Sequence, residues 1–422
     1  MTIVFFIVAL WATSLTLLFW LKKDLFIKTW NEPYFFDTPI LIESDDWGPG
    51  GGFHAKRLQT LLETLSLHRD SINRNAVLTA DVVLAVPDTR TIRDTPSHQY
   101  PRKLLDRDFP EIYQAMLTGI DNDLFVPQLH GLEHLNGEAF AELCKSEDPR
   151  TEKALADENW WDWEALDSPL QGHYVDGSSL PTKPINPIKA QGIIETATNT
   201  FEKLFGQPSL TTVAPCYLWN DQIESMWSHH SIQAIQTAGY RCNGRAKDGG
   251  YIQDKLLIRT GEKSIYGQIY LVRNVMFEPV DGKNTPESAY QEALRAYRQA
   301  LPITISTHRY NFTRTEAEFK LSLDGLSSLL NKLTLHIADT RFLSSAELAE
   351  ALRSPDKPIN NLFNNKKWPQ LNSLQGKAKL SPFLYRLYYR HPKLALISNL
   401  SGLILPGWII SQILNQKKNI KQ

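Results

Sequence analysis

Short apolar runs alternate with longer amphipathic segments through the middle of the chain, from about residue 35 to residue 352. The apolar runs predict buried strands at residues 38–44, 76–86, 123–130, 209–215, 268–274 and 302–308. Segments 55–68, 188–206 and 286–300 carry apolar residues at three- and four-residue spacing, which predicts helices. This alternation without an internal repeat indicates an α/β domain.

The N-terminal end differs from this middle region. Residues 1–21 contain no charged side chain, and a helix needs roughly 20 apolar residues to cross a bilayer. A cleaved signal peptide is the alternative interpretation, but the stretch has no basic start and no small-residue cleavage pattern. We therefore expect a transmembrane anchor over residues 1–22.

The C-terminal end is also apolar, with a linker before it. Residues 353–380 are rich in Pro, Asn and Lys, which is typical of a linker. Within residues 381–422, the uncharged stretch 394–414 is interrupted by Asn399, Gly402 and Pro406. This last segment can cross a membrane, lie in its interface or pack as an ordinary helix.

Composition narrows the chemistry. A net charge of -1 provides no general attraction to nucleic acid, so a nucleic-acid partner is not expected. Cys144, Cys216 and Cys242 have no CxxC spacing and cannot all pair. Any metal would therefore be held by histidines and carboxylates.

Polar clusters follow three of the predicted strands. The stretch "SDDWG" contains Asp45 and Asp46, "HGLEH" contains His130 and His134, and "ISTH" ends at His308. In a barrel of alternating strands and helices, the carboxyl ends of the strands assemble the active site. A divalent cation would relieve the repulsion between the two adjacent aspartates, and imidazole is a common metal ligand.

The motif "HGLEH" also fits the inverted zinc-protease pattern, in which Glu133 would be the catalytic base. That pattern requires both histidines to lie in a long helix. Pro127, Gly131 and Gly137 instead predict a strand that opens into a short turn. A metalloprotease is therefore the weaker alternative, and Glu133 is expected to be solvated or to support the ligands.

The ordered set "SDDWG", "HGLEH" and "ISTH" resembles the polysaccharide deacetylase family, and the resemblance covers about residues 38–350. It implies a distorted seven-stranded β/α barrel that closes with the strand and helix of residues 340–352. It also implies that Asp46, His130 and His134 bind a divalent metal, with zinc favoured. By the same resemblance, Asp45 is the catalytic base and His308 the catalytic acid.

The chain departs from the family pattern at several positions. Gly131 stands where the family has Ser or Thr, and Val213 stands where it has an arginine that orients the base. Another arginine, such as Arg241, Arg273 or Arg309, could take that role. The acidic fourth motif of the family is not recognisable in residues 239–250.

Together these features predict a membrane-anchored, metal-dependent deacetylase that acts on an N-acylated sugar of a surface polysaccharide or a lipid-linked glycan. A glycosidase on a related barrel and an inactive glycan-binding module remain alternatives. The tryptophans at 160, 161 and 163 are expected to belong to a packed insertion, and Trp219 to line a groove.

Basic residues suggest on which side of the membrane the barrel lies. Lys22, Lys23 and Lys28 follow the first apolar segment, while Arg386 and Arg390 precede the second. Positive residues that flank a membrane segment tend to stay in the cytoplasm. This pattern favours the cytoplasmic face, and no oligomeric state is predicted.

Overall fold

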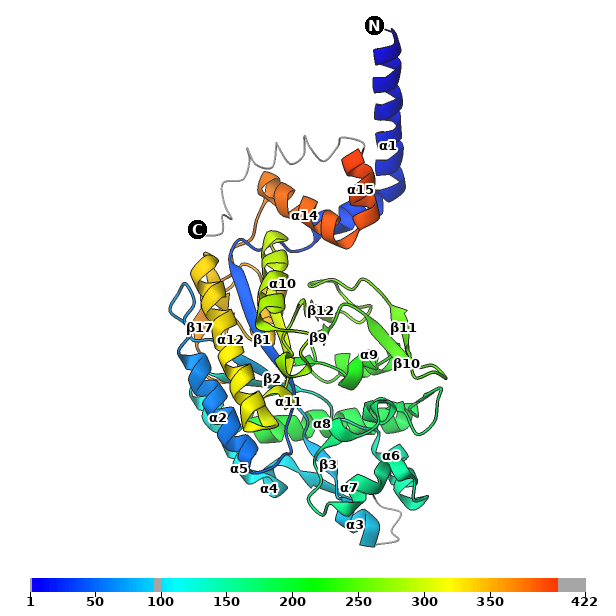
Figure 1. The fold of residues 1–422 in the computed structure, drawn as a ribbon, viewed down its shortest axis with the longest axis vertical. Helices are drawn as coiled ribbons and strands as arrows, with labels where there is room; N and C mark the ends of the chain where they lie inside the picture. The colour runs from blue at the N-terminus through cyan, green and yellow to red at the C-terminus, as the bar shows by residue number, and fades with distance from the viewer. Residues whose placement is uncertain (1, 95–99, 401–422) are drawn as a thin grey trace.

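A curved parallel sheet forms the centre of the computed structural model, which describes residues 2–94 and 100–400 (Figure 1). Its strands run in the order β12-β9-β8-β5-β2-β1-β14-β13, and β15 pairs with the start of β1. The bounds are β1 (Thr38–Trp47), β2 (Leu78–Val82), β5 (Phe125–Leu129), β8 (Thr211–Thr212), β9 (Ala234–Thr237), β12 (Ile269–Val272), β13 (Val275–Met276), β14 (Ile303–His308) and β15 (Thr340–Phe342).

The two ends of this order are joined by one stretch of chain. Strands β12 and β13 are separated only by Arg273 and Asn274. The Arg273 N–H donates to the Thr237 carbonyl of β9 (2.9 Å), and the Asn274 N–H donates to the Thr304 carbonyl of β14 (3.3 Å). When β12 and β13 are counted as one interrupted strand and β15 is set aside, seven strands form a distorted barrel, as the family resemblance implied.

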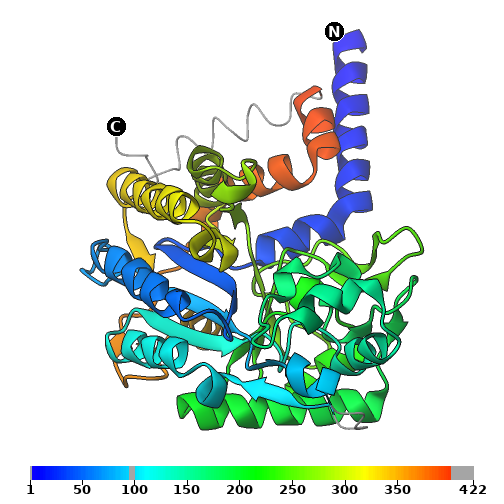
Figure 2. The same cartoon turned by 60° about the horizontal axis from the view of Figure 1, so that its bottom comes forward.

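Helices pack around the outside of the barrel (Figures 1 and 2). The longer ones are α2 (Phe53–Ser66), α5 (Pro110–Asp121), α8 (Pro187–Phe205), α10 (Pro286–Arg298), α12 (Glu316–His336) and α13 (Ser345–Arg353). The apolar faces of all but α13 join barrel strands in one large buried cluster, whereas α13 packs on β9 and β12 in a second one. All ten residues of β1 are buried. Local signals set the helix starts: the Thr315 hydroxyl and the Glu318 carboxylate form a capping box at the start of α12.

Shorter elements follow the carboxyl ends of the strands and connect the helices. The short helices are α3 (Thr89–Asp94), α4 (Leu105–Asp108), α6 (Gly137–Lys145), α7 (Glu152–Ala156), α9 (Asp221–Ser228) and α11 (Tyr310–Thr313). The short strands pair as β3 (Ala85–Pro87) with β4 (Arg102–Leu104), β6 (Val175–Asp176) with β7 (Lys183–Pro184), and β10 (Arg241–Arg245) with β11 (Tyr251–Lys255).

The predicted linker also has a defined position. Residues 353–380 contain the hairpin of β16 (Ile359–Asn360) and β17 (Lys367–Trp368). The Trp368 indole donates to Glu347 of α13 (3.0 Å), and Leu371 and Leu374 are buried. This segment therefore packs against the barrel.

The N-terminal helix α1 (Thr2–Asn31) leaves the barrel at the end where β1 begins (Figure 1). Its most apolar window has a mean hydropathy of 2.3 and is not buried by the rest of the chain, so α1 is long and apolar enough to cross a membrane. Helices α14 (Leu380–Arg390) and α15 (Pro392–Leu400) lie beside its base. The predicted apolar stretch 394–414 continues past Leu400 into residues outside the described part of the chain.

Candidate metal centre and active site

The two adjacent aspartates occupy a bulge near the end of β1. Asp46 has a left-handed backbone (φ 70°), and the pairing of β1 with β2 shifts register between Ser44 and Trp47. Successive side chains of a regular strand point to opposite faces, and a bulge breaks this alternation. Asp45 and Asp46 can therefore both reach one site. Gly48 permits the tight exit from the strand, because a Cβ there would lie 2.2 Å from the Val83 carbonyl oxygen.

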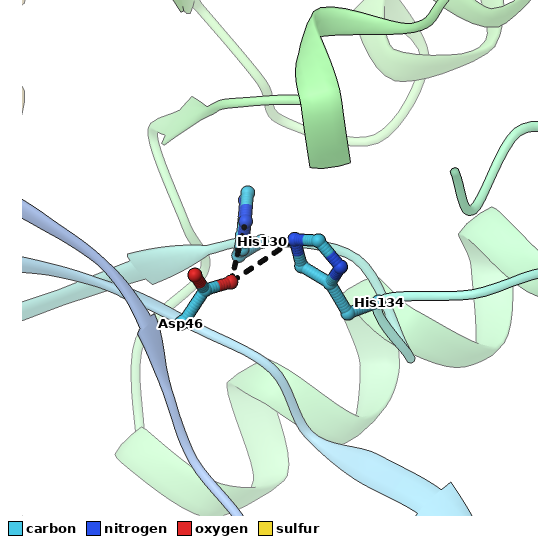
Figure 3. Close-up of side chains that lie close together, drawn as sticks. All are labelled: Asp46, His130 and His134. Atoms are coloured by element: carbon cyan, nitrogen blue, oxygen red, sulfur yellow. Dashed lines mark ion pairs between the residues drawn. The ribbon is translucent and has the colours of Figure 1, made fainter. Parts of the chain in front are cut away.

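One carboxylate oxygen of Asp46 faces both histidines of the "HGLEH" motif, as the dashed lines in Figure 3 show. Its Oδ1 is 3.4 Å from His130 Nε2 and 3.0 Å from His134 Nε2. The three side chains are buried and form a group whose ligand atoms all lie within 4.8 Å of one another. His130 Nδ1 lies 2.9 Å from the Val213 carbonyl, a contact that directs Nε2 towards Asp46.

The protonation states of these residues fit a divalent cation. Burial lowers the pKa of His134, which favours the neutral imidazole that binds metals. Burial opposes ionisation of Asp46, but His134 and His130 outweigh it and hold the pKa of Asp46 well below its usual range. Ligand atoms around a tetrahedral zinc ion lie roughly 3.4 Å apart. One carboxylate and two imidazoles at the observed spacing match that ligand set.

Both histidines lie outside helices, in the loop between β5 and α6. Gly131 has a φ of +87°, and a Cβ there would lie 2.9 Å from the Glu133 carbonyl oxygen and from the His173 ring. This explains why glycine stands where the resembled family has Ser or Thr. The Glu133 carboxylate is buried and binds Arg102 Nε (2.8 Å) and the Tyr100 hydroxyl (2.8 Å). Glu133 is therefore not solvated, and its position does not match a protease base.

Asp45 is held by a different partner, Arg273, which follows β12. The two terminal nitrogens of Arg273 donate to the two oxygens of Asp45, at 2.6 Å each. Its Nε donates to Glu43 (2.6 Å), and one terminal nitrogen also donates to Asp81 (2.9 Å). Although burial raises the pKa of Asp45, the guanidinium holds it well below its usual range, so Asp45 remains ionised.

Of the three candidate arginines, Arg273 is the one whose guanidinium contacts the Asp45 carboxylate. Arg241 pairs with Asp221 (2.6 Å) and Asp254 (2.7 Å). Arg309 donates to the Pro49 carbonyl (2.7 Å) and lies over the ring of Trp163.

The third polar cluster completes the site. His308 is the residue directly opposite Asp45 in the pairing of β14 with β1, and its Nε2 lies 3.8 Å from Asp45 Oδ2. Its Nδ1 lies 2.5 Å from Glu278 Oε1. Burial alone would lower the pKa of His308, but Glu278 and Asp45 raise it to about 10. His308 is therefore a cation at neutral pH.

The sequence did not indicate that Glu278 and Trp163 belong to the candidate site. Glu278 follows β13 closely, so its place after a strand was the available signal. The Trp163 indole N–H donates to Asp46 Oδ1 (3.3 Å), and its ring stacks on His134. Trp163 is buried in the insertion, as expected for a packed residue, and also contacts a proposed metal ligand.

The expectation for Trp219 was wrong. Trp219 does not line a groove: it is 1% exposed, and its indole donates to Glu224 (3.0 Å). The backbone N–H of the nearby Tyr217 donates to the Ala214 carbonyl (2.9 Å). The Tyr217 hydroxyl accepts a hydrogen bond from Arg273 (3.2 Å).

Solved structures similar to this chain include proteins described as deacetylases. A polysaccharide deacetylase from Mycobacterium smegmatis is 11% identical, with 80% of this chain and 96% of that chain covered and a TM-score of 0.38. The Bc1960 peptidoglycan N-acetylglucosamine deacetylase is 12% identical (80% and 93% covered, TM-score 0.37). The peptidoglycan deacetylase PdaC from Bacillus subtilis is 12% identical (76% and 93% covered, TM-score 0.34). No known family profile and no curated protein matches the sequence.

Proposed function

We propose that this chain is a metal-dependent hydrolase that removes an acyl group, most simply N-acetyl, from a sugar of a surface polysaccharide or a lipid-linked glycan. The observation that carries the proposal is that the two adjacent carboxylates, Asp45 and Asp46, contact different partners. Asp46 faces two imidazoles, whereas Asp45 accepts two hydrogen bonds from Arg273 and lies opposite His308. This arrangement supplies a cation site, a base and an acid within one cluster.

Asp46, His130 and His134 would hold the cation, and zinc suits one carboxylate with two imidazoles. When bound there, a divalent cation supplies a Lewis acid that polarises the acyl carbonyl and lowers the pKa of a water. Asp45, kept ionised by Arg273, accepts the proton of the attacking water. His308, kept protonated by Glu278, donates a proton from Nε2 to the departing amine.

A glycosidase needs a second free acid across from Asp45, and three of the surrounding carboxylates are already engaged. Glu43 and Asp81 both bind Arg273, and Glu278 binds His308. Burial and the neighbouring Asp45 raise the pKa of Asp81, and its contact with Arg273 (2.9 Å) keeps its carboxyl away from a substrate.

Acetate release from an N-acetylhexosamine oligosaccharide tests the proposal. The full chain, loaded in turn with zinc, cobalt, nickel and manganese, should release acetate with at least one metal. Oligosaccharide binding without acetate release under all four conditions would favour an inactive glycan-binding module.

The anchor is a further part of the proposal. We infer that α1 holds the barrel at a membrane, on the cytoplasmic face, because Lys22, Lys23 and Lys28 lie on the barrel side of its apolar stretch. A protease-sensitive tag beside the exposed Asn365 tests the side. Cleavage of that tag from outside intact cells would reverse the assignment.

A further inference from the structure

A pocket lies between α1 and α15 at the base of the apolar helix. It has a volume of about 500 Å³. Helix α1 contributes Leu18, Lys22 and Leu25, which lie on one face because they are four and three residues apart. The other wall comes from residues 390–394 and Ile397. Figures 1 and 2 both show α15 beside α1 here.

The lining of this pocket combines apolar and basic side chains, and both walls contribute to each kind. Leu18, Leu25, Leu394 and Ile397 supply the apolar part, and Lys22, Arg390, His391 and Lys393 supply the basic part. None of the described lining residues is acidic. An amphiphilic anion matches this combination, whereas a small free anion would leave the apolar walls unused.

Positive charge at this junction exceeds the acid available to neutralise it. Glu32 is shared by Arg259 (2.7 Å), Arg386 (2.9 Å) and Arg390 (2.6 Å). One carboxylate therefore faces three guanidinium groups, and Lys22 and Lys393 add to the surplus. An anion bound beside Arg390 would offset the remaining repulsion.

His391 supplies a second observation at the same place. Its Nε2 is buried and has no hydrogen-bond partner among the described residues. Burial and the neighbouring cations Arg259 and Arg390 lower the pKa of His391, and Lys22 acts in the same direction. The imidazole therefore offers a neutral polar group in a positively charged environment.

The depth of the pocket fits a lipid headgroup. Leu21 ends the uncharged stretch of α1, so a bilayer around this stretch would have its surface near Lys22. Leu18 lies one helical turn towards the hydrocarbon, about 6 Å from Lys22 along the axis. The basic residues therefore lie at headgroup level. Leu18 extends towards the acyl chains, whereas Leu25 lies on the barrel side of Lys22.

We propose that this pocket binds one anionic phospholipid, with its phosphate among Lys22, Arg390 and Lys393 and its acyl chains along Leu18 and Ile397. The inference rests on the proposed insertion of α1 in a bilayer. It is separate from the reaction of the barrel, because none of the pocket residues belongs to the candidate active site.

The test compares phosphatidylglycerol with phosphatidylcholine around the full chain in nanodiscs. Native mass spectrometry after mild release should find phosphatidylglycerol retained preferentially by the wild type. Lys22→Gln/Lys393→Gln should weaken this preference by roughly 30-fold, because each basic residue near a membrane surface contributes to anion attraction. Lys153→Gln/Lys203→Gln, which removes the same charge from exposed lysines of α7 and α8, should retain it.

The outcomes separate the proposal from its premise. Equal phosphatidylglycerol retention by the wild type and the pocket variant would overturn the lipid site, as would full displacement of the lipid by inorganic phosphate. Failure of the wild type to enter phosphatidylcholine discs would instead refute the anchor and the lipid site with it. Melting curves check that the variants fold. If the double variant does not fold, the single Lys393→Gln variant is used in its place.

Discussion

Arg273 holds Asp45 through both ends of its guanidinium, with two contacts of 2.6 Å, although the two residues lie 228 positions apart in the chain. This fork fixes the plane of the carboxylate and keeps it ionised. Glu43 and Asp81 also form ion pairs with this guanidinium. The geometry of the proposed base therefore depends on a residue that lies two strands away in the sheet, beyond β14.

Arg273→Lys should lower kcat by roughly 100-fold, because a lysine cannot form the two-point contact and a small misplacement of a reacting group has this effect. The bound metal should remain. The pKa of Asp45 should rise, so the acidic limb of the pH–kcat/KM profile should move to higher pH. Arg241→Lys is the matched control, and an equal loss of activity in that variant would contradict the role of Arg273.

The two aspartates should respond differently to the same substitution. Asp45→Asn should abolish deacetylation, by at least about 100-fold, and keep the metal, because only the base is removed. Asp46→Asn should lose metal and activity together. Elemental analysis and acetate release measure both outcomes, and near-normal turnover of Asp45→Asn would show that another group is the base.

His130→Ala and His134→Ala should each remove most of the bound divalent ion from the purified chain, because one of three protein ligands is lost. Metal-induced stabilisation against heating should disappear in parallel. His229→Ala, on the exposed end of α9, serves as the control. Full metal occupancy in both ligand variants would disprove the assigned site.

Glu278→Gln should lower the pKa of His308, whose value of about 10 depends chiefly on that carboxylate. Because the folded-state pKa is raised above the ordinary value of 6.5, protonated His308 stabilises the fold fully below about pH 6.5 and loses this effect as pH rises through about 10.

The variant should therefore lose less unfolding free energy than the wild type between about pH 7 and about pH 10.5. The basic limb of its kcat/KM profile should also move to lower pH. Denaturant titrations at each pH measure the first effect. Glu287→Gln, an exposed carboxylate on α10, should behave as the wild type.

Trp163→Phe should weaken metal binding by about 10- to 100-fold, the usual effect of removing a hydrogen bond to a metal ligand. The ring still stacks on His134, so the stability of the metal-free fold should change little. Trp160→Phe, whose ring stacks on Phe140, is the control. Equal metal affinity in both variants would show that Trp163 contributes to packing and not to metal binding.

The barrel was predictable because its strands are buried on both faces and appear as apolar runs. Strand β9 was missed: it spans only Ala234–Thr237 and contains the polar Gln236, which donates to Asp81 in the interior. Polar residues inside a barrel interrupt the apolar signal on which strand prediction relies.

The side-chain clusters at strand ends were predictable for a similar reason, since parallel strands bring their carboxyl ends together. Their partners were harder to predict. Arg273 was one of three candidates, and only the interruption between β12 and β13 places it inside the barrel. Trp219 follows a strand as Glu278 does, yet it packs against Glu224, because position after a strand does not fix the direction of a side chain.

The path of β1 has a consequence for which substrates the candidate site could reach. The strand starts at Thr38, beside the base of α1, and advances about 23 Å to Asp45 at roughly 3.3 Å per residue. A bilayer around α1 would therefore face the entrance of β1, while the metal ligands lie towards its other end. If α1 crosses a bilayer as proposed, the first sugar on a lipid phosphate would lie nearer to the start of β1 than to Asp45. The proposed anchor would then favour sugars of a lipid-linked glycan that lie farther from the phosphate, at the level of the candidate metal ligands.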